Sequence, residues 1–288
     1  MHPFVYERPR TLAEAIALLE RHQPDARLLA GGTDLIIRLR DRSLRPSMVI
    51  DLKRVDELRP TIREAEGRLW IGATSVMTDI AADPRVRRHF VALAEAASVI
   101  GSVQIRNRAT LAGNICNASP AADTAPALLV YGATVVAVGS IGTRRIPIDE
   151  FFVRSGVTTL QRDELIVAIE LPLPTLRMGA THVRRTRRRG HDLASVTLTC
   201  GVDESGVTRL AYGSVGPRPV LEVDETGTLA AGTTREARAD VLERMFAGAT
   251  PSPRSMRASP DYRLAMLRVL GERALDTAIH RLGEGWDG

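Results

Sequence analysis

The sequence predicts an α+β protein in two parts, with a boundary near residue 175. Helix and strand patterns are interspersed over residues 1–175. The last strand pattern of that stretch is stopped by Pro172 and Pro174, because proline cannot donate to a sheet ladder. Three strand patterns in succession and then two helix patterns follow, which predict a three-stranded antiparallel sheet plus helices over residues 176–288. A chain of 288 residues, 44% of them hydrophobic, is long enough for two domains.

The elements of the first part are placed by capping residues and by apolar runs rich in β-branched residues. Thr11 and Glu14 form a capping box ahead of an amphipathic helix. Residues 102–123 are predicted as one long loop. Strands are predicted at 27–29, 48–52, 69–71, 134–138, 144–148 and 165–171, and helices at 89–99 and 124–131.

The second part carries equally local signals. Strands are predicted at 182–185, 196–202 and 207–215, with a turn at 203–206 between the last two. Thr233 and Glu236 form a second capping box that predicts a helix start. Ser259 as N-cap and Pro260 at the first helical position predict the start of the final helix.

Composition excludes several classes of protein. The formal charge is +5, and Lys53 is the single lysine, so the basic side is almost entirely arginine. Nucleic-acid binding is not expected, because aromatic residues make up only 4% and do not interleave with a basic face. Cys116 and Cys200 form no C-x-x-C motif, so we expect neither a metal or iron–sulfur ligand set nor a disulfide framework.

The chain start and its hydropathy indicate a cytoplasmic protein. The first nine residues contain no apolar segment of the signal-peptide type. No run approaches the roughly 20 apolar residues of a membrane span, so no membrane partner is expected.

A first loop, residues 30–34 (AGGTD), follows the strand predicted at 27–29. Its consecutive glycines allow backbone angles closed to other residues and let the main chain approach a ligand closely. Successive N–H groups in such a turn form a concave anion site suited to a pyrophosphate, and Thr33 adds a hydroxyl. For this motif taken alone, a simple tight turn is the alternative.

A second loop, residues 110–123, is richer in polar groups. Thr110, Gly113 and Asn114 offer a hydroxyl, a bare backbone and an amide. Asp123 at its end can accept hydrogen bonds from ribose or ribityl hydroxyls, can cap the helix that follows, or can do both. We interpret Cys116, inside this loop, as a buried inert thiol.

Other motifs carry less information. A G-x-G-x-x-G at residues 283–288 has no strand before it and no helix after it, so we reject a Rossmann interpretation. Neither a Walker motif nor a G-x-S-x-G is present. Residues 184–189 hold five arginines in six positions, which suit a cofactor phosphate, a nicotinamide cofactor, an acidic partner or a solvated face.

The two loops, LAGGTDL at 29–35 and TLAGNI at 110–115, resemble those of the FAD-binding subunits of the xanthine dehydrogenase and carbon monoxide dehydrogenase family. The resemblance covers nearly the whole chain. Each motif is modest alone, but their order along the sequence is specific. The matching segments are residues 3–15, 29–35, 110–126, 164–172, 188–196, 216–220 and 262–275.

The resemblance implies a two-lobed FAD-binding domain of the vanillyl-alcohol-oxidase (PCMH) type over residues 1–175 and a small α+β domain over 176–288. Ala112 departs from the family where a second glycine is common, and Arg184 departs where lysine is usual. The implied cofactor-binding residues are Leu29, Ala30, Gly31, Gly32, Thr33, Asp34, Leu35, Ile100, Thr110, Leu111, Ala112, Gly113, Asn114, Asp123, Ile166 and Arg184. In this set Asp123 binds cofactor hydroxyls, while Ile100 and Ile166 are apolar contacts.

The resemblance also implies a function within a molybdenum hydroxylase made of three kinds of subunit. A large partner subunit would hydroxylate the substrate at a molybdenum cofactor, and a small partner would pass electrons through two [2Fe–2S] clusters. FAD in this chain would then reduce NAD⁺, oxygen or another acceptor. No catalytic side chain and no metal site are expected in this chain, because the flavin performs the chemistry.

Two alternatives to this function stay open from the sequence. One is a self-sufficient FAD-dependent oxidase of the same fold, which needs a substrate pocket of its own. The other is a non-enzymatic module that binds an anion or an acidic partner through its arginines, an interpretation that leaves both glycine loops unexplained.

Overall fold

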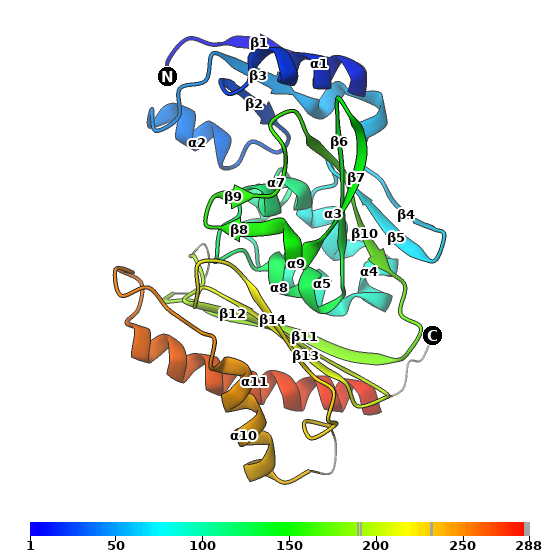
Figure 1. Ribbon diagram of the computed structural model, residues 1–288, viewed down its shortest axis with the longest axis vertical. Helices are drawn as coiled ribbons and strands as arrows, with labels where there is room; N and C mark the ends of the chain where they lie inside the picture. The colour runs from blue at the N-terminus through cyan, green and yellow to red at the C-terminus, as the bar shows by residue number, and fades with distance from the viewer. Residues whose placement is uncertain (189, 191, 231–232, 285–288) are drawn as a thin grey trace.

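The computed structural model describes residues 1–188, 190, 192–230 and 233–284. We call residues 1–58 the N-terminal lobe, residues 59–174 the middle lobe, and the described residues from 175 onward the C-terminal part. Figure 1 shows the three stacked in chain order, with the N-terminal lobe at the top and the C-terminal part at the bottom.

The N-terminal lobe is a small parallel sheet covered by a helix. Its strand order is β1–β3–β2, with β1 at Val5–Glu7, β3 at Met48–Asp51 and β2 at Ala26–Leu29. The capping box at Thr11 is confirmed, and it begins α1 (Leu12–His22). The first loop leaves β2 and enters the short helix α2 (Leu35–Arg40). Two 3-10 turns, Leu52–Arg54 and Asp56–Leu58, end the lobe.

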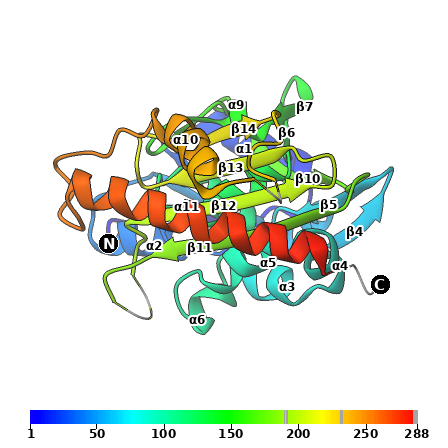
Figure 2. The ribbon, with the colours of Figure 1, turned by 90° about the horizontal axis from the view of Figure 1, so that it is seen from below.

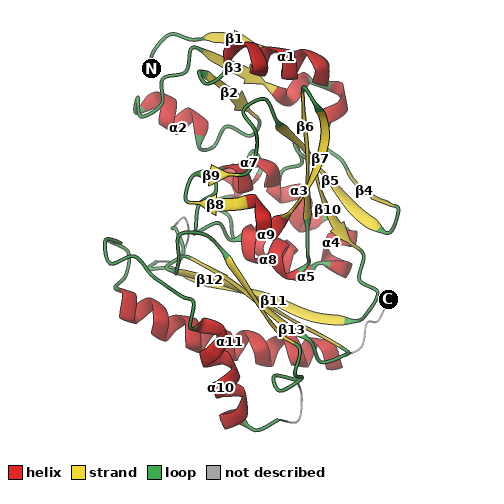
Figure 3. Ribbon diagram, viewed as in Figure 1, coloured by secondary structure: helices red, strands yellow, loops and turns green. Residues whose placement is uncertain are grey.

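The middle lobe is built on a five-stranded antiparallel sheet with helices packed against it (Figure 3). The predicted strands 69–71, 134–138, 144–148 and 165–171 are all present in it, each within one or two residues. In spatial order the sheet comprises β4 (Ile62–Ala65), β5 (Arg68–Gly72), β10 (Leu165–Pro172), β6 (Thr134–Gly139) and β7 (Gly142–Pro147).

Helices and a short hairpin complete this lobe. The helix predicted at 124–131 is confirmed as α8. In chain order the helices and the hairpin are α3 (Met77–Ala82), α4 (Pro84–His89), α5 (Val91–Ser98), α6 (Val103–Arg106), α7 (Leu111–Cys116), α8 (Thr124–Val130), α9 (Ile148–Phe151), β8 (Phe152–Arg154) and β9 (Val157–Thr158).

The helix predicted at 89–99 is confirmed as α5, which follows the fully buried Phe90 at its N-cap and is preceded by the separate short helix α4. One prediction for this lobe is wrong. The long loop predicted at 102–123 contains α6 and α7. Each begins at a hydroxyl cap: Ser102 Oγ accepts from the N–H of Ile105, and Thr110 Oγ1 accepts from the N–H of Gly113.

The C-terminal part is a four-stranded antiparallel sheet in the described chain, rather than the three-stranded sheet predicted. The unpredicted strand β14 is short, lies at the sheet edge and follows a proline-containing turn, so its sequence pattern is weak. The strands, in spatial order, are β11 (Met178–Arg185), β12 (Val196–Asp203), β13 (Thr208–Gly213) and β14 (Val220–Asp224).

Two helices follow these strands. Helix α10 (Arg235–Phe246) is capped by Thr234, not by the predicted Thr233, because the Thr234 hydroxyl accepts from the N–H of Ala237. Ser259 caps α11 (Pro260–Gly283) as predicted. Figure 2 shows α11 running along the outer face of the sheet. None of the helices in the described residues is long and apolar enough to cross a membrane.

The C-terminal sheet is buried on both faces. Its outer face packs on α10 and α11, while its inner face packs on α5 and α8 of the middle lobe. The approach is close: a Cβ at Gly201 of β12 would lie 2.8 Å from Cγ1 of Val130 in α8. The sheet is therefore held firmly against the middle lobe, and its inner face can contribute side chains to a site there.

Candidate functional site

A cavity of about 410 Å³ lies where the three regions of the chain meet. The N-terminal lobe contributes the first loop and α2, and the middle lobe contributes the second loop, Ile100 and Ile166. The C-terminal part contributes Arg184, from the end of β11. A ligand in this cavity would contact segments more than 150 residues apart in sequence, so the complete site exists only in the folded chain.

The structure brings most of the predicted cofactor-binding residues together in this cavity. The two exceptions are Leu29 and Leu111. Leu111 is fully buried in the core, and Leu29 lies beneath the first loop, where its Cδ1 would be 2.8 Å from a Cβ at Gly32. The residues that do line the cavity are Ala30, Gly31, Gly32, Thr33, Asp34, Leu35, Ile100, Thr110, Ala112, Gly113, Asn114, Asp123, Ile166 and Arg184.

The first loop needs both of its glycines. A Cβ at Gly31 would lie 2.0 Å from the carbonyl oxygen of Arg108, so only glycine allows the loop to pack against the segment that leads into the second loop. Gly32 has φ +79°, a left-handed conformation that favours glycine. The backbone N–H groups of Gly31, Gly32 and Thr33 donate to no acceptor in the described residues. Three successive N–H groups without an acceptor are what the predicted anion-binding turn requires.

The second loop presents further donors. Thr110 caps α7, and the N–H of Ala112 in its first turn donates to no described group. The Asn114 side-chain oxygen accepts from the Thr124 hydroxyl at 2.6 Å, which leaves the Asn114 NH₂ group to donate elsewhere. The two loops also touch directly, since Asn117 Nδ2 lies 3.4 Å from Asp34 Oδ1.

The capping role considered for Asp123 is wrong, because its side chain makes no hydrogen bond to the first turn of α8. Its carboxylate points instead at the C-terminal sheet. Oδ2 accepts from Arg184 Nη1 at 2.6 Å, and Oδ1 accepts from the Thr197 hydroxyl at 2.9 Å. Burial acts to raise the pKa of Asp123, but the neighbouring His182 and Arg184 outweigh burial and hold that pKa below its ordinary value. Asp123 is therefore an ionised, partnered group in the cavity.

The arginine run does not form one functional face. Arg184 lines the cavity and pairs with Asp123, whereas Arg185 donates to the Tyr262 hydroxyl at 2.9 Å. Arg187 pairs with Asp192 at 3.3 Å, and Arg188 is exposed. Arg189 lies outside the described residues. Strand geometry explains why Arg184 and Arg185 differ, since successive side chains of β11 point to opposite faces.

Several cavity residues could not be found from their motifs. Cys116 is exposed and lines the cavity, so the prediction of a buried thiol is wrong, but desolvation raises the pKa of this thiol to about 12, in line with the predicted inertness. Arg27 and Arg38, which flank the first loop, also line the cavity, as do Asp192 and Leu193. Only the proximity of Arg27 and Arg38 to the glycine pair in sequence could have suggested them.

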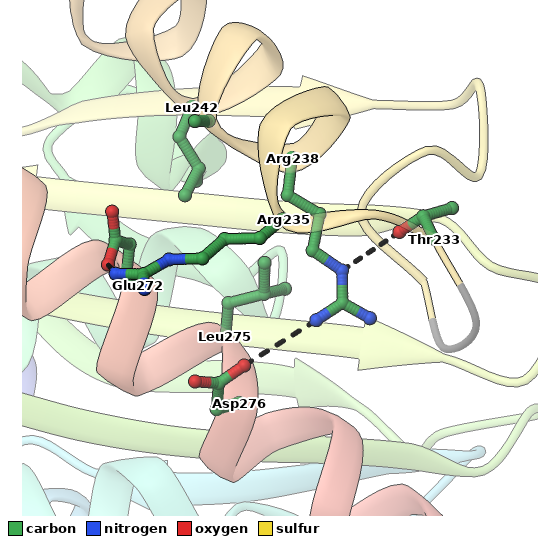
Figure 4. Close-up of a pocket in the computed structure, with 8 residues that line it drawn as sticks. Thr233, Arg235, Arg238, Leu242, Glu272, Leu275 and Asp276 are labelled. Atoms are coloured by element: carbon green, nitrogen blue, oxygen red, sulfur yellow. Dashed lines mark hydrogen bonds and ion pairs between the residues drawn. The ribbon is translucent and has the colours of Figure 1, made fainter.

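A second groove lies between α10 and α11 and is less suited to a charged ligand (Figure 4). Its cations are already neutralised: Arg238 pairs with Asp276 at 3.5 Å and Arg235 pairs with Glu272 at 3.3 Å. The described residues contain no group of three or more His, Cys, Asp or Glu side chains placed to hold a metal ion.

Comparison of the sequence with known proteins identifies its family. Residues 2–174 match the family described as the FAD binding domain in molybdopterin dehydrogenase. The xanthine dehydrogenase FAD-binding subunit of Escherichia coli O157:H7 is 33% identical over 285 residues, covering 96% of this chain and 97% of that protein. The carbon monoxide dehydrogenase medium chain of Hydrogenophaga pseudoflava is 33% identical over 283 residues, covering 96% and 98%. The chain belongs to this family of FAD-binding subunits.

Solved structures of molybdopterin dehydrogenases have the same fold. Carbon monoxide dehydrogenase from Hydrogenophaga pseudoflava matches with a TM-score of 0.88 and 31% identity, over 98% of this chain and 99% of that chain. Quinoline 2-oxidoreductase from Pseudomonas putida 86 matches with a TM-score of 0.88 and 29% identity, over 97% and 98%. The α+β class and the PCMH-type FAD-binding fold are therefore confirmed, and the chain is an oxidoreductase subunit.

Membership of the molybdopterin dehydrogenase family makes FAD the cofactor, and the cavity fits it. The free N–H groups of the first loop suit the negative charge of a pyrophosphate. Ile100 and Ile166 supply apolar wall, and Asp123 and Asn114 supply groups for hydroxyls or amides. No other feature of the described residues combines these three elements in one cavity.

Proposed function

We propose that FAD binds between the two loops, with its pyrophosphate on the N–H groups of Gly31, Gly32 and Thr33. The observation that carries this placement is the row of free donors at a point where Gly31 lets two backbones meet. Asp123 would accept from cofactor hydroxyls, and Arg184 would face the cofactor beside it. The remaining cofactor-binding residues predicted from the sequence would complete the wall, with Leu29 and Leu111 supporting it from behind.

We propose that this chain relays electrons from partner [2Fe–2S] clusters to an external acceptor such as NAD⁺ or oxygen. When bound, FAD supplies the redox chemistry that couples these centres. The chain orients the cofactor and surrounds it with the apolar side chains of Ile100, Ile166 and Leu165. No side chain of this chain is assigned a catalytic role.

We further propose that a large molybdenum-cofactor subunit and a small [2Fe–2S] subunit are the partners. The relatives support this proposal, because each is named as a subunit or chain of a dehydrogenase. This chain matches almost the full length of each of them. A division into an FAD-binding domain (1–175) and a C-terminal domain (176–288) is likewise a proposal, supported by the family match that ends at residue 174.

The experiment that tests the relay uses the tagged chain in its own host. Purification should bring down a larger and a smaller subunit with the yellow chain, and added NAD⁺ or oxygen should reoxidise the reduced flavin of the complex. If the purified chain alone oxidises an organic substrate without partners, the self-sufficient oxidase is the correct function. A colourless chain that does not take up added FAD would contradict both.

Cys116 provides a direct test of the cofactor site. It lines the cavity and is exposed, while the only other cysteine, Cys200, is fully buried. We expect a maleimide to label the FAD-free chain once, and saturating FAD to slow this labelling roughly tenfold or more, because the cofactor occludes the thiol. Mass spectrometry measures the rate. Cys116→Ser should remove the labelling, and an FAD-independent rate would place the cofactor elsewhere.

A further inference from the structure

A buried histidine lies directly beneath the cavity and has an unfilled hydrogen-bonding position. The side chain of His182, on β11, is only 1% exposed. Its Nδ1 lies 3.0 Å from the Thr199 hydroxyl, whereas its Nε2 has no hydrogen-bond partner among the described residues. Oδ1 of Asp123 lies 3.7 Å from Nε2. This separation is too long for a hydrogen bond but short enough for a charged imidazole to close it.

The charges around His182 balance only while Asp123 keeps its ion pair with Arg184. Asp123 carries one negative charge, and Arg184 on β11 supplies its positive partner at 2.6 Å. Glu95 of α5 accepts from the backbone N–H of His182 at 2.8 Å and pairs with Arg281 of α11 at 2.6 Å. With Tyr131 uncharged at the end of α8, the set is neutral when His182 is neutral.

A bound FAD changes this balance, if it is placed as we propose. Arg184 lines the cavity, and a cofactor group that accepts its hydrogen bonds weakens its hold on Asp123. The pyrophosphate also brings negative charge into a site with little water, where charges interact strongly. A buried carboxylate that loses its cationic partner is costly, and a proton on His182 Nε2 would restore a cation beside it.

We propose that His182 takes up a proton when FAD binds, so that its imidazolium becomes the second cation of Asp123. His182 touches Asp123 and not the cofactor, so it is a positioning residue rather than a catalytic one. The inference depends on the proposed placement of FAD next to Arg184 and Asp123.

The sign of the resulting pH dependence follows from the proton balance. Because the complex holds more protons than the free chain, FAD binds more tightly as the pH falls. The dependence is confined to the pH interval in which the complex and the free chain differ in the number of protons they hold. Within that interval the dissociation constant changes by at most about tenfold per pH unit for one proton.

The test is calorimetric titration of FAD into the FAD-free full chain at neutral pH, in phosphate and in Tris buffer. These buffers differ in their heat of ionisation, so the difference in binding heat counts the protons taken up. We expect uptake of a substantial fraction of one proton by the natural chain, and none by His182→Gln, which still accepts and donates hydrogen bonds but cannot be charged. His280→Gln, at an exposed position on α11, should keep the uptake.

The outcomes separate this inference from the placement of FAD. Equal heats in the two buffers, or uptake that persists in His182→Gln, would overturn the role of His182 while leaving the cofactor site intact. Absence of any FAD binding would instead contradict the proposed site. If His182→Gln does not fold, His182→Asn provides a second neutral substitution, and the proton count of the natural chain still decides whether any proton is taken up.

Discussion

Replacing Gly31 with alanine is expected to lower the affinity for FAD by about 100-fold or more. The new Cβ would lie 2.0 Å from the carbonyl oxygen and 2.8 Å from the carbonyl carbon of Arg108, both of them backbone atoms that cannot rotate away. The first loop would have to move off the second loop, which separates the donors that hold the pyrophosphate. Titration of the FAD-free chain, followed by flavin fluorescence, measures the change.

The same substitution should cost stability as well, by about 1–3 kcal/mol, because the chain is overpacked at this contact. Gly283→Ala is the matched control: a Cβ there meets nothing within 4 Å, so both FAD affinity and stability should stay as they are. Binding by Gly31→Ala within about threefold of the natural chain would mean that the close contact of the two loops is not needed for the cofactor.

Asp123→Ala is expected to reduce the free energy of unfolding by about 2–4 kcal/mol and to weaken FAD binding. The substitution leaves the Thr197 hydroxyl and the Arg184 guanidinium without their acceptor, in a place where Asp123 is only 5% exposed. The cost is moderated because Arg184 lines the cavity and can be hydrated there. Chemical denaturation of the FAD-free chain measures the loss directly.

The effect of Asp123 on stability should depend on pH in a defined direction. Its pKa in the folded chain lies below the ordinary value of 3.8, so the ionised form is favoured by folding. The contribution is complete above that ordinary value and is lost as the pH falls through the lower folded pKa. The stability difference between the natural chain and Asp123→Ala should therefore shrink in acid, below about pH 4.

Asp276→Asn serves as the control for Asp123. Asp276 is also paired with an arginine, Arg238, but its side chain is 73% exposed, so its loss should cost less than about 1 kcal/mol. An Asp123→Ala variant no less stable than Asp276→Asn would show that the buried network beneath the cavity contributes little to folding.

Local signals in the sequence were sufficient for much of the fold and for the two loops. The strands of the middle lobe and the caps at Thr11 and Ser259 follow from side-chain alternation and from hydroxyl groups that satisfy the first N–H groups of a helix. The need for glycine at positions 31 and 32 was likewise readable, because a left-handed or close-packed backbone excludes other residues. These signals act within a few residues of chain.

Short and edge elements were less predictable for the same reason. The strand β14 has too few residues to establish an alternating pattern, and the caps at Ser102 and Thr110 open helices too short to show a helical repeat.

The sequence by itself determined the secondary structure of most segments, the family, and the two loops that point to FAD. Only the tertiary structure decided what Asp123 and His182 do. Strand β12 alternates apolar and hydroxyl residues as if Thr197 and Thr199 faced water, yet both are fully buried against the middle lobe. Docking of the C-terminal sheet buries that polar face against the middle lobe, and the partners that the sheet supplies to Asp123 are more than 50 residues away in sequence. Contacts between such distant segments are set by packing of the whole chain, which no local pattern encodes.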